Sequence, residues 1–123
     1  LVGADSIAAD GSVINKIGTA GLAVSARDRG VPIIVAAQSI KLDPRTLTGA
    51  AVTIEERNPE EVIDAGTRAE IGEIGVANPA FDVTPPRHVD AIVTEHGQFP
   101  PESVVVLMRE LFGNGISEPW ESV

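Results

Sequence analysis

The sequence predicts an α/β domain with a mainly parallel sheet, and two observations carry this prediction. Val31–Ala37 is a continuous apolar run of the kind found in parallel strands that are buried on both faces. Segments with strand character also alternate with segments of helical spacing, which is typical of crossover connections between parallel strands. We therefore expect a three-layer, Rossmann-like arrangement in which helices cover the sheet.

The amino-terminal part of the chain predicts a strand, a helix and a second strand, in that order. Leu1–Ala4 has the apolar character of a strand end, and Asp5–Ile14 is expected to be a connection. Asn15 suits a helix N-cap, apolar residues follow it at roughly helical spacing, and Gly30 marks the end of this helix. Val31–Ala37 is then the next strand.

The carboxy-terminal part predicts shorter elements. Asn58 and Pro59 suit the N-cap and the first position of a short helix, and Pro100 starts a longer helix that Gly113 ends. The residues of that last helix that are expected to face inward are Val105, Met108, Leu111 and Phe112. The other expected elements are an edge strand at 51–54, a loop at 66–75, a brief strand at 76–77, a short helix at 84–90 and a final strand at 91–95.

The length of 123 residues, with 43% hydrophobic residues, suits one domain with one core. The chain opens without Met, at what reads as the end of a buried strand. We therefore expect residues 1–115 to be the carboxy-terminal domain of a longer protein and 116–123 to be a tail, in which Trp120 either docks on a neighbouring chain or is disordered. A charged leader and an apolar run of about 18 residues are both absent, which predicts a cytoplasmic protein.

Charge and cysteine content argue against several classes of function. Eighteen acidic residues oppose nine basic ones, for a formal net charge of −9, whereas nucleic-acid binding needs clustered Lys and Arg. The chain has no cysteine and therefore no disulfide, thiolate metal site or cysteine nucleophile. His88 and His96 lack metal-ligand spacing, and there is no glycine-rich nucleotide loop, so we expect neither a metal nor a cofactor. Excess acid with little lysine resembles proteins of salt-loving microbes.

Lysine is confined to two segments that suit an anion. Lys16 follows Asn15 near the expected start of a helix, and Lys41 follows the second predicted strand. An amide and an ammonium group at a helix start can bind a phosphate. Ligands of α/β sheets bind beyond the carboxyl ends of the strands, and Asp5 follows such an end. We therefore expect Asp5, Asn15, Lys16 and Lys41 to line one pocket.

Each of these residues also has a purely structural interpretation. A capped helix with an early lysine is common, an aspartate after a strand often caps a turn, and a single lysine is usually a solvated surface residue. The residue types alone leave both interpretations open.

Three motifs taken together resemble one protein superfamily. They are GADSIAADG at residues 3–11, NKIGT at 15–19 and NPAFDVTP at 78–85. The superfamily contains the α, β and δ subunits of translation initiation factor 2B, the methylthioribose-1-phosphate isomerases and the archaeal ribose-1,5-bisphosphate isomerases. The similarity runs from Leu1 to about Gly113 and implies the carboxy-terminal Rossmann-like domain of such a protein.

Within this superfamily the resemblance is closest to the archaeal ribose-bisphosphate enzymes. The isomerases carry a proton-donating aspartate at the position of Asp5, where regulatory subunits often have another residue. The ribose-bisphosphate enzymes are similar to this chain in having a lysine after the second strand, so Lys41 is expected to hold a second phosphate. Asn15 and Lys16 are expected to bind the substrate as well. Thr84–Asp90 also resembles archaeal sequences.

The resemblance therefore implies an isomerase that converts ribose 1,5-bisphosphate to ribulose 1,5-bisphosphate in nucleoside-phosphate salvage. Its base would be a cysteine upstream of this chain, so the chain alone is expected to be inactive. The alternatives are a regulatory subunit similar to those of translation initiation factor 2B and a methylthioribose-1-phosphate isomerase. The family also implies a homo-oligomer, a dimer or a hexamer, with a sugar phosphate as ligand and neither nucleic acid nor membrane as partner.

Overall fold

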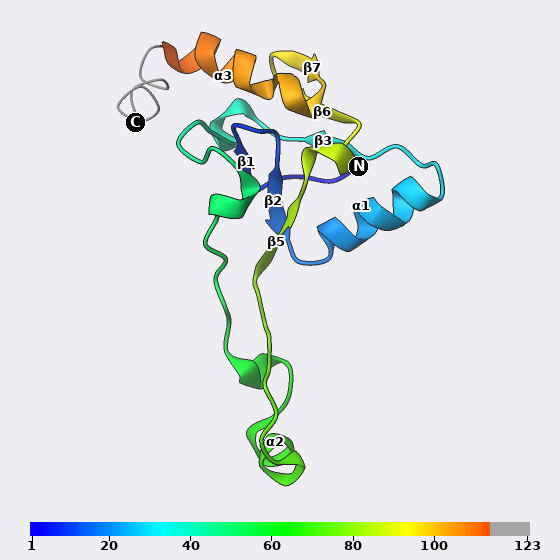
Figure 1. Ribbon diagram of the computed structural model, residues 1–123, viewed down its shortest axis with the longest axis vertical. Helices are drawn as coiled ribbons and strands as arrows, with labels where there is room; N and C mark the ends of the chain where they lie inside the picture. Colours follow the sequence, from blue (N-terminus) through cyan, green and yellow to red (C-terminus); the bar gives the residue numbers. More distant parts are fainter. Residues whose placement is uncertain (114–123) are drawn as a thin grey trace.

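Two small sheets and three α-helices organise residues 1–113, which are the residues that the computed structural model describes (Figure 1). This is the predicted α/β class. The strands are not mainly parallel as predicted, because three of the strand pairs are antiparallel and two are parallel. No helix in this part of the chain is long and apolar enough to cross a lipid bilayer. The predicted tail at 116–123, with Trp120, lies outside the described residues.

The first sheet has the strand order β4–β1–β2–β5. β1 (Ser6–Ala8) and β2 (Val13–Lys16) form an antiparallel hairpin, β4 (Leu42–Asp43) lies parallel to β1, and β5 (Phe81–Thr84) pairs antiparallel with β2. The predicted connection at Asp5–Ile14 is therefore wrong. β1 and β2 are short, and they pair with β4 and β5, which lie far away in the sequence. A local sequence pattern does not reveal such pairing.

The second sheet, β3–β6–β7, contains the strands that the apolar runs predicted. β3 (Ile34–Ala36) and β6 (Ala91–Thr94) are parallel and confirm, in shorter form, the strands expected at 31–37 and 91–95. The strand expected at Leu1–Ala4 is a single parallel bridge between Val2 and Val35. β7 (Gly97–Phe99) returns antiparallel along β6 and was missed, because three residues are too few to show a strand pattern.

The first helix, α1 (Thr19–Asp28), forms where a helix was predicted, but Asn15 is not its N-cap. Asn15 belongs to β2, and Gly18 precedes the first helical residue with φ 107° and ψ −24°. This left-handed backbone conformation is strained for any residue with a Cβ atom. Gly18 therefore turns the chain from strand to helix, and Asn15 lies three residues too early to do so.

The last helix, α3 (Val104–Phe112), is confirmed, and Gly113 follows it with φ 62°. Its buried residues are Val104, Leu107 and Met108, and the half-buried Val105 packs beside them. Leu111 and Phe112 are 37% and 45% exposed, which contradicts the prediction that they face inward. They lie in the last helical turn, next to the end of the described chain, whereas the buried residues lie over the core.

An arm, residues 52–80, projects from the body of the molecule and carries α2 (Ala65–Ile71) at its far end (Figure 1). A loop was predicted at 66–75, so α2 corrects that prediction; the sequence signal was Asp64, whose carboxylate accepts the Thr67 N–H at 2.8 Å. Neither 51–54 nor 76–77 forms the strand that was predicted. The two legs of the arm meet instead at an isolated antiparallel bridge between Glu56 and Pro79.

Two short predicted helices are present as single 3-10 turns. Pro59–Glu61 forms one of them, and the Asn58 side chain caps it by accepting the Glu60 N–H at 2.9 Å. Pro86–His88 forms the other, within the range predicted at 84–90. Proline at or next to the first position suits both turns, because its missing N–H has no partner there anyway.

The core is built jointly by both sheets and α3. The side chains that are at most 1% exposed include Ile7, Val13, Val35, Ile92 and Met108. Burying each such side chain contributes about 1.5–3 kcal/mol relative to leaving it in water. Because these residues come from five different elements, the core connects β1 and β2 to the parallel strands that lead to the candidate site.

The turn between β1 and β2 provides a test of this packing. Gly11 has φ 91°, and a Cβ atom there would overlap the carbonyl oxygen of Pro101 and lie 2.7 Å from its carbonyl carbon. We expect Gly11→Ala to lower the free energy of unfolding by about 2–4 kcal/mol, through backbone strain and overpacking. Urea unfolding followed by circular dichroism measures this loss.

Gly21→Ala is the matched control for this substitution. Gly21 lies within α1, and nothing is within 4 Å of the added methyl group. Alanine in a helix interior should stabilise the protein by about 0.5–1 kcal/mol relative to glycine. Equal unfolding midpoints for the two variants would contradict the close approach of Pro101 to the turn.

Candidate functional site

The carboxyl ends of three parallel segments point to one edge of the second sheet. Val2, β3 and β6 run in the same direction, and they are followed by Asp5, the Gln38–Lys41 segment and Glu95 respectively. Asp5 and Lys41 thus follow neighbouring parallel segments. Ligands of α/β sheets bind at this edge, so it is the candidate functional site.

Asp5 lies where the chain passes from the second sheet to the first. Its backbone N–H donates to the carbonyl oxygen of Ile14 at 2.8 Å, directly before Asn15 in β2. The residue as a whole is exposed. The backbone of Asp5 is therefore fixed against β2, while its carboxyl group is accessible to a ligand.

Lys41 ends a short turn that is fastened at both ends. The turn is the 3-10 helix Ser39–Lys41, and the Ser39 N–H donates to the Glu95 carboxylate at 2.7 Å. The residue after Lys41 is Leu42 of β4, which pairs with Ile7 of β1. This pairing holds the exposed Lys41 near the start of β1, the strand that Asp5 directly precedes.

The Asn15–Thr19 segment is closed by its own hydrogen bonds. The Asn15 side-chain amide donates to Thr19 Oγ1 at 3.2 Å, and the Thr19 hydroxyl donates to the Lys16 carbonyl oxygen at 2.8 Å. A third contact comes from outside the segment, because the Asp82 carboxylate accepts the Gly18 N–H at 2.8 Å. The segment is therefore a defined turn between β2 and α1.

Lys16 and Asn15 lie on opposite faces of the strand pair. Asn15 pairs with Asp82 and Lys16 pairs with Phe81, and successive residues of a strand point to opposite sides. Lys16 is exposed on its side of the strand pair. The pKa of Glu61 is lowered mainly by its hydrogen bond to Arg57, and the positive charge of Lys16 also contributes to lowering it.

The sequence prediction missed two carboxylates that organise this region. Glu95 holds the turn that leads to Lys41, and Asp82 holds the turn that contains Lys16. Glu95 had the same signal as Asp5, an acid directly after an apolar strand. Asp82 lies within the NPAFDVTP motif, but its bond to Gly18 spans 64 residues and follows only from the pairing of β2 with β5.

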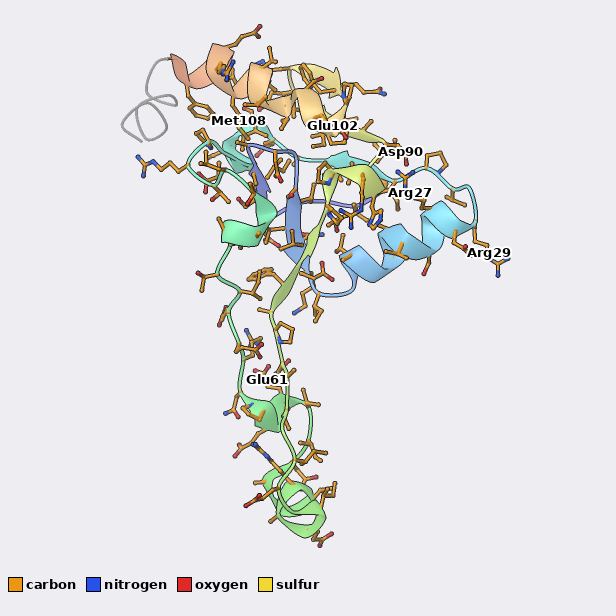
Figure 2. The ribbon with its side chains drawn as sticks, in the orientation of Figure 1. Arg27, Arg29, Glu61, Asp90, Glu102 and Met108 are labelled. Atoms are coloured by element: carbon orange, nitrogen blue, oxygen red, sulfur yellow. The ribbon has the colours of Figure 1, made fainter. Side chains whose placement is uncertain are left out.

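A small cavity lies at the opposite, amino-terminal ends of β3 and β6. Its lining residues are Arg27, Gly30, Val31, Pro32 and Asp90, two of which are labelled in Figure 2. The Asp90 carboxylate is already engaged, because it accepts the Ile33 N–H at 2.7 Å. Within residues 1–113, no three His, Asp or Glu side chains are grouped so that they could hold a metal ion.

Comparison with known proteins identifies relatives of the chain. The model of the Initiation factor 2 subunit family matches residues 1–101. The ribose 1,5-bisphosphate isomerase of Haloferax volcanii is 71% identical over 98% of this chain and 37% of its own length. The chain therefore spans little more than a third of that relative.

Two solved structures share the fold. The 5-methylthioribose 1-phosphate isomerase of Pyrococcus horikoshii matches with a TM-score of 0.74 and 40% identity, over 90% of this chain and 31% of that one. Subunit delta of translation initiation factor eIF-2B from A. fulgidus matches with a TM-score of 0.69 and 41% identity, over 85% and 31%. Because an isomerase and a translation-factor subunit share this fold, the fold alone does not decide the function.

The bond between Ser39 and Glu95 predicts a pH dependence of the Lys41 turn. The Ser39 N–H, the largest influence, holds the pKa of Glu95 below its ordinary value. A carboxylate with a lowered folded-state pKa stabilises the fold fully above its unfolded pKa of about 4.3, and this contribution is lost as the pH falls through the folded pKa. We expect the hydrogen-exchange protection of the Ser39 amide to decrease as the pH falls through the folded-state pKa of Glu95.

In Glu95→Gln, protection of the Ser39 amide should be reduced and should no longer change over this pH range. Glu70→Gln is the control, because Glu70 lies in α2 at the end of the arm. Unchanged Ser39 protection in Glu95→Gln, measured by NMR, would show that the carboxylate does not hold the turn.

Proposed function

The chain belongs to the Initiation factor 2 subunit family, and we propose that the protein containing it converts ribose 1,5-bisphosphate to ribulose 1,5-bisphosphate. The observation that carries this proposal is the 71% identity to the ribose 1,5-bisphosphate isomerase of Haloferax volcanii over 98% of the chain. The acidic, lysine-poor composition, which indicated a halophilic protein, fits this relative. The activity is assigned to the whole protein, because the chain spans only 37% of that isomerase.

The proposed reaction needs an acid and a base. A sugar with a phosphate on its anomeric oxygen cannot open its ring by ordinary mutarotation. Protonation of the ring oxygen lets the bond between C1 and that oxygen break, and removal of the C2 proton then gives an enol phosphate. Loss of the proton from the C2 hydroxyl and addition of a proton at C1 complete the ketose. General acid–base catalysis by two positioned groups supplies these transfers.

Asp5 is the proposed acid, and the base is proposed to be a cysteine outside this chain. The position of Asp5 at the carboxyl edge of the parallel strands supports this role, and so does the resemblance of its Gly-Ala-Asp motif to the isomerases. A carboxyl group acts as an acid near neutral pH where a dry pocket favours its neutral form. Since Asp5 is exposed here, we propose that the rest of the protein covers it.

Asn15, Lys16 and Lys41 are the proposed phosphate ligands. Lys41 is supported by its place near the start of β1, on the same edge as Asp5. Asn15 is supported by the contact of Asp5 with the adjacent Ile14. Lys16 faces the opposite side of the strand pair, so it reaches a shared pocket only if its flexible side chain folds around the end of β2. Two phosphates held at separate lysines would fix both ends of the sugar.

The larger assembly is part of the same proposal. Val2, β3 and β6 already form a parallel ladder, which supports a three-layer, Rossmann-like sheet completed by other segments of the protein. The arm carries exposed apolar side chains, among them Val62 and Ile71, which are 60% and 56% exposed. Exposed apolar surface of this kind favours contact with another subunit, and we propose a homo-oligomer.

Two other functions are represented among the structures that share the fold, a methylthioribose-1-phosphate isomerase and a translation-factor subunit. Asp5 favours an enzyme over a regulatory subunit, because a regulator does not need an acid at this place. Lys41 favours a bisphosphate over a methylthio sugar, which has only one phosphate.

In the full-length protein, Asp5→Asn should abolish turnover of ribose 1,5-bisphosphate while leaving its affinity within a few-fold. The amide has the size and polarity of the carboxyl group but cannot deliver a proton. Coupled assay of ribulose 1,5-bisphosphate formation and calorimetric binding separate the two effects. The chain of residues 1–123 alone is the blank, since its sequence contains no cysteine base. An active Asp5→Asn enzyme would show that Asp5 is not the acid, whereas absence of turnover in the wild type would favour the regulatory alternative.

Lys41→Ala should weaken binding of ribose 1,5-bisphosphate far more than binding of ribose 1-phosphate, which lacks the 5-phosphate that Lys41 is proposed to hold. A charge-assisted contact with a phosphate is worth about 1.5–3 kcal/mol, or about ten- to a hundredfold in affinity. Arg45→Ala is a nearby control on the following loop. Equal losses for both sugars in Lys41→Ala would remove this lysine from substrate discrimination and return the methylthioribose alternative to equal standing.

A further inference from the structure

The carboxylate of Asp82 binds the start of α1 from β5, the strand next to β2. Asp82 lies in the middle of β5, and its side chain accepts the Gly18 N–H at 2.8 Å. Both of its oxygens also lie 3.2 Å from the Ala20 nitrogen, which donates to them. These bonds span 64 and 62 residues, so they exist only because β5 pairs with β2.

The start of α1 needs such a partner because its own sequence provides none. The residue at its N-cap is Gly18, which has no side chain, and the first turn of α1 contains no acidic residue. The first backbone N–H groups of a helix lack internal partners and carry a partial positive charge. Asp82 supplies both the missing hydrogen-bond acceptor and the negative charge.

The hydrogen bonds of Asp82 limit how a phosphate can bind at the start of α1. A helix start is often an anion site, as the sequence suggested for the Asn15–Thr19 segment. In this structure a protein carboxylate already occupies the N–H groups of Gly18 and Ala20. A phosphate at the same amides would lie against the negative charge of Asp82. The groups of this segment that stay available to a phosphate are therefore side chains, above all those of Asn15 and Lys16.

Asp82 is linked to Asn15 by strand pairing, and Asn15 is linked to the backbone of Lys16 by hydrogen bonds. It is the cross-strand partner of Asn15, so the two side chains lie on the same face of the strand pair. Asn15 donates to Thr19 Oγ1, and the Thr19 hydroxyl donates to the carbonyl oxygen of Lys16. The clamp on Gly18 and Ala20 lies directly beside this chain of bonds and fixes the direction in which the segment leaves β2.

We infer that Asp82 is a positioning residue for the substrate phosphate, which acts by clamping the start of α1 so that the Asn15 side chain, together with a Lys16 side chain folded around the end of β2, binds the anion in place of the helix amides. This inference rests on the proposed function, because it takes the Asn15–Thr19 segment as part of the sugar-phosphate site. Asp82 itself does not take part in proton transfer.

The test is Asp82→Asn in the full-length protein, assayed for turnover of ribose 1,5-bisphosphate. The amide keeps the shape of the carboxylate but has one acceptor oxygen and no charge, so the segment should loosen. We expect KM to rise about tenfold, the effect of losing one charge-assisted interaction, while kcat stays within about twofold. An unchanged KM, or a loss of kcat with unchanged KM, would overturn the inference.

Asp64→Asn is the matched control. Asp64 caps α2 with the same chemistry, since its carboxylate accepts the Thr67 N–H at 2.8 Å and the Thr67 hydroxyl at 2.7 Å, but it lies on the arm. It should lower stability without changing KM. A KM increase of the same size in Asp64→Asn would mean that loss of any helix cap is sufficient, and this would also overturn the inference.

Two further measurements separate failure of the inference from failure of the proposed function. Hydrogen exchange should speed up at the Gly18 and Ala20 amides in Asp82→Asn and not in Asp64→Asn; unchanged exchange at both amides would refute the clamp. If the wild type binds but does not turn over ribose 1,5-bisphosphate, the proposed function fails. The inference then stands if calorimetry shows weaker binding in Asp82→Asn, and it falls if binding is equal or if the wild type does not bind.

Discussion

The antiparallel pairing of β2 with β5 is the contact on which the rest of the structure depends. It joins Val13–Lys16 to Phe81–Thr84, with four residue pairs in register. Without it β2 would lose one of its two neighbours, and the leg of the arm that leads into β5 would lose its attachment to the first sheet (Figure 1). The same pairing brings Asp82 to the start of α1. One strand pair thus fixes the arm, the helix and the turn that contains Lys16.

The sequence predicted well those elements whose signal is local. The apolar runs of β3 and β6 and the proline and glycine boundaries of α3 are sufficient in themselves, because apolar strands and helix termination leave direct marks in the residue order. The predicted burial of β3 on both faces was wrong, since Val35 is buried and Ala36 is exposed. β1, β2 and β5 were missed because each has only three or four residues and depends on partners far along the chain. The strands predicted at 51–54 and 76–77 were wrong. Their apolar residues suggested strands, but neither sheet of the described residues has a strand that pairs with them.

The residues of the candidate site also divide into those that a local sequence signal predicts and those that only strand pairing places. Asp5 and Lys41 were placed on one edge from strand direction alone, and the observed parallel ladder has that direction. Asn15 was assigned to a helix start because N-cap residues are recognised by type, whereas its position in β2 is set by pairing with β5. Asp82 and Glu95 could not be assigned, because a carboxylate that accepts a backbone N–H from another element has no signature in its own neighbourhood.

Under the proposed function, these two carboxylates also bear on how an acidic chain could bind an anionic ligand. Asp82 and Glu95 are adjacent to the candidate site, yet each is directed at a backbone N–H, which offsets its charge locally. The chain as a whole has a formal net charge of −9 and only two lysines, while each phosphate of a sugar bisphosphate carries about −1.5 to −2 charges at pH 7. Under the proposed function, Lys16 and Lys41 would not balance two phosphates by themselves. Further positive charge would have to come from arginines of this chain or from other parts of the protein.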